Sequence, residues 1–152
     1  MLSKDDIYKV DNVWCIHIRE GKEYQRLKNA YSERVIPVHS ELIRLGFLDY
    51  IESVKGDRIF PMLRITKSNS FSAQVSQWFG LLLKKLDIGP NKTFHSFRHT
   101  FSDALRNEGV DVSLTAALIG HSTGTITYDR YSKRLNPSIL VDVVEKIAPI
   151  EI

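Results

Sequence analysis

Residues 94–120 read FHSFRHTFSDALRNEGVDVSLTAALIG, and this stretch predicts two consecutive helices joined by a short turn. Apolar residues at intervals of three and four mark one face of the first helix: Phe94, Phe97, Phe101 and Leu105. Because this period is helical, we expect the phenylalanines to lie in the core. Gly109 is suited to end the first helix, Asp111 to cap the second, and Gly120 to close it.

The chain upstream begins with a predicted sheet. Residues Ile7 to Ile18 are rich in valine, isoleucine and aromatic side chains and are broken by Asp11-Asn12, which suits a turn. A charged stretch follows, with Glu20-Gly21-Lys22 as a second turn signal, and Arg34 to Pro37 then reads as a short strand. Together these segments predict a small antiparallel sheet.

Helical patterns take over after this sheet. Ser40 to Leu45 predicts a short helix that Gly46 can close, with Phe47 following as an apolar contact. Asp57 to Pro61 reads as another short extended piece. The next helix has apolar residues at helical spacing: Phe71, Val75, Trp78, Phe79, Leu82 and Leu86.

The last predicted helix begins at Asn136-Pro137-Ser138, because proline is favoured in the first turn of a helix. Its apolar residues are Leu140, Val143, Val144 and Ile147. We therefore expect an α+β fold, with a mostly helical body and a small antiparallel β-sheet at the N-terminal end.

The composition excludes several classes of protein. The 152 residues are 43% hydrophobic and 26% charged, which is ordinary for one globular domain and unlike a disordered chain. No apolar run approaches the roughly 20 residues of a membrane span, and no signal-peptide pattern opens the chain. The single Cys15 excludes an internal disulfide, predicts a buried thiol and fits a reducing cytoplasm. The net charge of +3 only slightly favours binding to polyanions such as nucleic acids.

Five side chains suit phosphoryl transfer on DNA without a metal: Lys28, His95, Arg98, His121 and Tyr131. In such a reaction a nucleophile attacks phosphorus, the charge on the non-bridging oxygens is neutralised, and the leaving oxygen takes a proton. An arginine matches two phosphate oxygens with its planar fork, and a tyrosine can hold the phosphate as an ester. A lysine or histidine can supply the proton. The chain has each part of this set except a second arginine.

The order and spacing of these motifs resemble the tyrosine recombinases of the phage integrase type. The motifs are His95-x-x-Arg98-His99-Thr100-Phe101, then Leu118-Ile119-Gly120-His121-Ser122, then Arg130-Tyr131-Ser132. Upstream, Lys28-x-x-x-Ser32-x-Arg34-Val35-Ile36-Pro37 resembles the β-hairpin that carries the family's catalytic lysine. The similarity extends over nearly the whole chain, and the ordered series is far more specific than the His-x-x-Arg element alone.

The resemblance implies a role for each of the five residues. Tyr131 would attack the scissile phosphate, which gives a 3′-phosphotyrosyl link and a free 5′-hydroxyl. Arg98 would hold the non-bridging oxygens, and His121 would donate a further hydrogen bond to them. Lys28 would protonate the leaving 5′-oxygen, and His95 would assist proton transfer around the nucleophile. Neither a cofactor nor a metal is implied, because the bond energy is conserved in the ester.

The resemblance also implies partners and a departure from the family pattern. Double-stranded DNA would be the substrate, and the segment Pro137 to Ile147 resembles the helix that such enzymes dock onto a neighbouring protomer, as in a tetramer on DNA. The family's first arginine normally lies just before a pair like Asp6-Ile7, and Arg19 and Arg26 lie in the wrong context to replace it. We therefore expect residues 1–152 to be one catalytic domain that is truncated at its N-terminus, without the family's DNA-clamping domain.

Several alternatives stay open on the sequence. Tyr128 competes with Tyr131 as the nucleophile, and Lys28 could be an ordinary solvated lysine. Ser32 and Arg34 could bind a phosphate or merely decorate an edge strand. The chain could also be a non-catalytic DNA-binding or assembly module.

A zinc hydrolase is a third function to weigh. His95 and His99 are four residues apart on one helix, a spacing that can bind zinc. Ser96 stands where a zinc metalloprotease motif has glutamate, which disfavours that reading.

Overall fold

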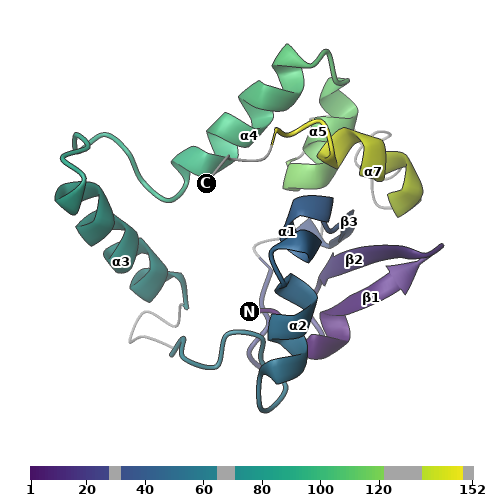
Figure 1. The fold of residues 1–152 in the computed structure, drawn as a ribbon, viewed down its shortest axis with the longest axis horizontal. Coiled ribbons are helices and arrows are strands. Elements are labelled where there is room, and N and C mark those ends of the chain that lie inside the picture. Colours follow the sequence, from purple (N-terminus) through teal and green to yellow (C-terminus); the bar gives the residue numbers. More distant parts are fainter. Residues whose placement is uncertain (28–31, 65–70, 122–134, 149–152) are drawn as a thin grey trace.

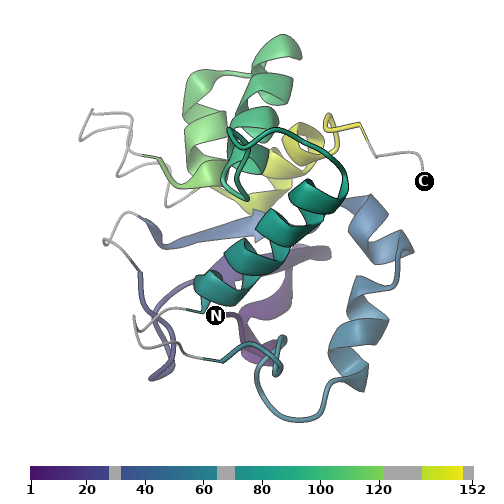
Figure 2. The same ribbon diagram turned by 90° about the vertical axis from the view of Figure 1, so that its left-hand side faces the viewer.

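The computed structural model describes residues 1–27, 32–64, 71–121 and 135–148. Six α-helices and one three-stranded antiparallel sheet lie in these ranges. The α+β class predicted from the sequence is therefore confirmed. Figures 1 and 2 show the sheet at the N-terminal end of the fold and the helices around it. None of the helices in the described ranges combines the length and the apolar character that crossing a membrane requires.

The sheet consists of β1 (Ile7–Val10), β2 (Val13–Ile18) and β3 (Arg34–Pro37), paired in that order. Asp11 and Asn12 form the two-residue turn between β1 and β2, with φ angles of 47° and 67°. Both angles are positive, and Asp and Asn tolerate them better than most residues do. The predicted hairpin and the predicted antiparallel sheet are thus both present. Cys15 lies in the central strand and is fully buried, as predicted.

A buried carboxylate fastens the chain's start to the sheet. A short 3-10 helix, η1 (Lys4–Asp6), precedes β1, and the side chain of Asp6 is fully buried. Asp6 accepts hydrogen bonds from the backbone N–H and the hydroxyl of Ser3, from Gln25 Nε2, and from Arg19 Nε. Burial alone would raise the pKa of Asp6, but these bonds outweigh it and hold the pKa below its usual value.

Two short helices follow the sheet where only one was predicted. Helix α1 (Ser40–Arg44) ends near Gly46 as expected, but Phe47 begins a second helix, α2 (Phe47–Ser53). Gly46 adopts a φ of 86°, so it lets the chain turn from the first helix into the second. Asp57 to Pro61, predicted to be extended, makes only an isolated bridge from Arg58 to Ser3.

Helices α3 (Ser72–Lys85) and α4 (Ser96–Asn107) form where the apolar spacing predicts them. The expectation that the whole phenylalanine stripe is core is wrong, because Phe94 and Phe97 are 46% and 55% exposed. Their rings pack on Phe79 of α3 with centroids 5.5 and 5.3 Å away, and Phe79 is the buried member. In Figure 1, α3 stands to one side of the other elements, so this aromatic contact is separate from the main core.

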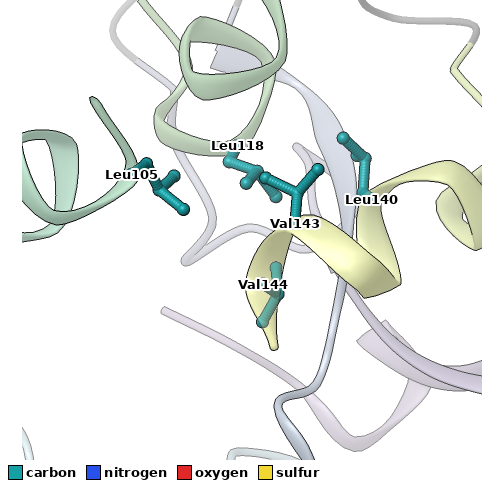
Figure 3. Close-up of a cluster of buried hydrophobic side chains, with 5 residues drawn as sticks. All are labelled: Leu105, Leu118, Leu140, Val143 and Val144. Carbon is teal, nitrogen blue, oxygen red and sulfur yellow. The ribbon is translucent and has the colours of Figure 1, made fainter. Parts of the chain in front are cut away.

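The main core lies between α4, α5 (Val112–Ile119) and α7 (Pro137–Val144). The buried cluster drawn in Figure 3 consists of Leu105, Leu118, Leu140, Val143 and Val144. The side chain of Asp111 caps α5 as predicted, and that of Asn136 caps α7, each by accepting a bond from a backbone N–H group. Helix α7 also packs on β3 and β2, so the cluster joins the helical body to the sheet.

Candidate functional site

Arg98 and His121 meet between neighbouring helices. Arg98 lies in the first turn of α4, and its Nε donates a hydrogen bond to Nε2 of His121 at 3.2 Å. Helix α5 packs against α4, and His121 follows the end of α5 directly. Two side chains that the sequence assigns to one phosphate are therefore within hydrogen-bonding distance of each other.

The turn after α5 sets the position of His121. Gly120 adopts a left-handed conformation with a φ of 68°. The backbone N–H groups of Gly120 and His121 both donate to the carbonyl of Ala116, at 2.8 and 3.0 Å. This is the hydrogen-bonding pattern of a glycine-terminated helix, and it returns the chain toward α4.

The contact with Arg98 fixes the protonation of His121. A guanidinium can only donate, so Nε2 of His121 must be the acceptor and the ring proton must lie on Nδ1. Burial, the nearby Arg98, and more weakly His95, His99 and Arg34 lower the pKa of His121 from its usual value. His121 is therefore neutral at neutral pH, and within the described ranges its Nδ1–H is available as a donor to an anion.

Arg34 approaches the same place from the sheet. It is the first residue of β3, and its Nε donates to the carbonyl of Leu118 at 2.8 Å while Nη1 donates to the carbonyl of Ser32 at 2.7 Å. Burial, and then the charge of Arg98, lower the pKa of Arg34 to about 10. The sequence left Arg34 undecided between phosphate binding and edge-strand decoration. The side chain turns toward α5 instead of standing free in solvent.

The site concentrates positive charge, and among the described residues no carboxylate forms an ion pair with it. The ion pairs formed in the described ranges involve neither Arg34 nor Arg98. Burial lowers the pKa of Arg98 as well. Two half-buried guanidinium groups and a neutral imidazole donor favour an anion, and a phosphate diester presents the two oxygens that such donors match.

The predicted residue His95 lies next to this cluster, at the N-cap of α4. Its ring contacts the ring of His99 edge-on, with centroids 5.2 Å apart. In the described ranges, histidine, cysteine and acidic side chains form no group of three that could hold a metal ion. The zinc alternative thus gains no third ligand from the part of the chain that is described.

Lys28, Tyr131 and Tyr128 lie outside the described residues. The roles predicted for Lys28 and Tyr131 therefore stay predictions, as does the choice of Tyr131 over Tyr128. Ser32, the residue that flanks Lys28 in the proposed hairpin, is described and meets Arg34 through its carbonyl.

A separate hollow lies between the sheet and the start of α3. Its volume is about 990 Å³, and its lining includes Ile16, Ile36, Phe71 and Val75. Neither arginine of the cluster lines it, nor does any of the three histidines. The candidate site is therefore the cationic cluster of Arg34, Arg98 and His121, and not this hollow.

Comparison with known proteins agrees with these motifs. The sequence matches the phage integrase family over residues 1–136, which is most of the chain. No curated protein and no solved structure matched it. The matched range includes every predicted catalytic residue, from Lys28 to Tyr131. The chain therefore belongs to the phage integrase family, whose general function is site-specific recombination of DNA.

Proposed function

We propose that this chain cleaves and rejoins DNA strands through a 3′-phosphotyrosyl intermediate, with Tyr131 as the nucleophile. The observation that carries the proposal is the contact between Arg98 and His121 beside Arg34, a cationic cluster without a carboxylate among the described residues. A transition state of phosphoryl transfer develops negative charge on its equatorial oxygens, and donors fixed in advance stabilise that charge.

Arg98 and His121 each have a task in this reaction. Arg98 already uses Nε to bind His121, which leaves its Nη groups to donate to the non-bridging oxygens of the scissile phosphate. His121 donates to the same phosphate from Nδ1. Because its pKa is lowered, His121 performs this task as a neutral donor.

The proposed chemistry balances without a nucleotide. The bond from the Tyr131 oxygen to phosphorus forms while the bond from phosphorus to the 5′-oxygen breaks. The tyrosine proton passes to a base beside it, for which His95 is the candidate, and Lys28 gives a proton to the 5′-oxygen. A 5′-hydroxyl from another duplex reverses these steps and completes the exchange of strands.

The substrate in this proposal is double-stranded DNA, and residues 1–152 act as one catalytic domain. For a tetramer on DNA, the segment from Pro137 to Ile147 would contact a neighbouring protomer through its exposed residues, such as Ile139, because Leu140, Val143 and Val144 are buried in the chain's own core. The alternative function, DNA binding or assembly without catalysis, shares the cationic cluster but lacks the covalent step.

The covalent step separates the two functions. The chain is incubated with a DNA duplex that carries a nick close to the scissile phosphate, so that the short fragment diffuses away and the protein stays linked to DNA. We expect a slowly migrating adduct on a denaturing gel from the parent chain and from Tyr128→Phe, and none from Tyr131→Phe. An adduct from Tyr131→Phe refutes the nucleophile assignment. DNA binding without any adduct from the parent chain favours the assembly function.

A further inference from the structure

Arg34 joins the sheet to the end of α5. Its Nε bonds the carbonyl of Leu118, and its Nη1 bonds the carbonyl of Ser32 on its own side of the fold. The last carbonyls of a helix have no partner within the helix, and they favour a positive charge. One side chain thus satisfies a helix-terminal carbonyl 84 residues away in the sequence.

The same guanidinium lies against Gly120. A Cβ atom added to Gly120 would be 2.5 Å from Nη1, 2.8 Å from Cζ and 3.2 Å from Nε of Arg34. Two of these distances are shorter than a real Cβ contact, so any side chain at Gly120 would force the Arg34 guanidinium to move. Arg34 therefore contacts the residues on either side of the helix end, Leu118 by a hydrogen bond and Gly120 by packing.

These contacts leave His121 little freedom. His121 directly follows Gly120, and its imidazole has to reach Arg98 on the neighbouring helix. A change in the direction of the chain at Gly120 would move the imidazole relative to Arg98. A displacement of about 1 Å can cost an enzyme two orders of magnitude in rate.

We propose that Arg34 is a positioning residue for the phosphate-binding pair, which holds the turn from Leu118 to His121 so that the imidazole meets Arg98 before DNA arrives. This inference rests on the proposed function for its consequence in catalysis. The planar guanidinium of Arg34 donates to two carbonyls in different parts of the fold, those of Leu118 and Ser32. Neither a general positive charge nor a place on an edge strand would require this geometry.

Two substitutions separate position from charge. Arg34→Met removes both, whereas Arg34→Lys keeps the charge but loses the planar fork that bonds Leu118 and Ser32. We expect both variants to form the covalent adduct about 10- to 100-fold more slowly than the parent chain. Arg34→Lys keeps the charge, so its DNA affinity should change little. Arg58→Met is the matched control, because Arg58 also bonds two carbonyls, those of Leu63 and Pro61, but outside the cationic cluster.

A second readout does not depend on activity. NMR titration of the His121 ring in the full chain reports its surroundings, which are Arg98, His95 and His99 on α4 and Arg34 on β3. The hydrogen bond that His121 accepts from Arg98 stabilises the neutral ring. Its loss should therefore raise the pKa of His121 in both variants. The pKa should stay at the parent value in Arg58→Met.

The two measurements test the positioning role of Arg34 and the proposed catalytic function separately. A raised His121 pKa in Arg34→Lys, with slower adduct formation, supports positioning. A parent-like His121 pKa and rate in Arg34→Lys overturns it, because charge alone then suffices. If Arg34→Met does not fold, Arg34→Lys carries the test. If the parent chain forms no adduct, the proposed function fails and the NMR titration still decides whether Arg34 positions His121.

Discussion

Replacing Gly120 with alanine should destabilise the fold much more than replacing Gly109 does. The two glycines are matched, because each follows a helix and each has a φ of 68°. An L-residue in this conformation costs about 1–2 kcal/mol at either position. They differ in what surrounds them. An added Cβ at Gly109 meets no atom within 4 Å, whereas at Gly120 it meets Nη1 of Arg34 at 2.5 Å.

The extra cost at Gly120 follows from the bonds of Arg34. The guanidinium is the end of a flexible side chain and can move, but moving gives up its bond to the carbonyl of Leu118. A hydrogen bond from a charged group contributes about 1.5–3 kcal/mol. For a chain of this size, each kcal/mol lowers the melting temperature by about 2–4 °C, so Gly120→Ala should melt about 3–12 °C below Gly109→Ala.

Thermal unfolding followed by circular dichroism measures this difference. The same pair of substitutions is then made in an Arg34→Met background, where no guanidinium is left to displace. We expect the two alanine variants to melt together in that background, as a double-mutant cycle requires of residues that act through each other. Equal melting of Gly120→Ala and Gly109→Ala in the parent chain would refute the close packing of Arg34 on Gly120.

Two further predictions concern stability. The pKa of Asp6 is lowered in the fold, so the ionised carboxylate stabilises the folded state above the ordinary carboxyl pKa of about 4, and this stabilisation is lost as the pH falls below that value. Urea unfolding between pH 7 and pH 2 should show the loss as a lower free energy of unfolding, and the loss should be smaller in Asp6→Asn. Leu140→Ala should lower the free energy of unfolding by about 2–5 kcal/mol, because Leu140 is 2% exposed in the main core, and an equal effect from Ile139→Ala, which is 52% exposed, would contradict that account.

The sequence predicts best those elements whose ends are encoded locally. Asp11 and Asn12 specify their turn by residue type, and Asp111 and Gly120 bound α5 in the same way. Helix α2 was not predicted, because Gly46 is typical of the end of a helix. In the structure the same left-handed residue also precedes the first residue of α2. A local signal of this kind does not say what the chain does after the turn.

Tertiary contacts explain what the sequence could not predict. The spacing of Phe94 and Phe97 correctly indicates a helix, but their exposure depends on where α3 lies. Likewise, the pairing of Arg98 with His121 follows from an ordered motif, whereas the task of Arg34 depends on β3 packing against the end of α5. The only local signal for Arg34 was its place in the segment that ends at Pro37.

Identification of the residue that is linked to DNA tests Tyr131 as the nucleophile. The adduct formed on the nicked duplex is digested with a protease and a nuclease, and the peptide that keeps a nucleotide is sequenced by mass spectrometry. We expect a phosphotyrosyl bond at Tyr131, formed by the parent chain and lost when Arg98 is replaced by methionine. A nucleotide on Tyr128 or on any other residue, or an adduct that forms equally well without Arg98, would contradict it.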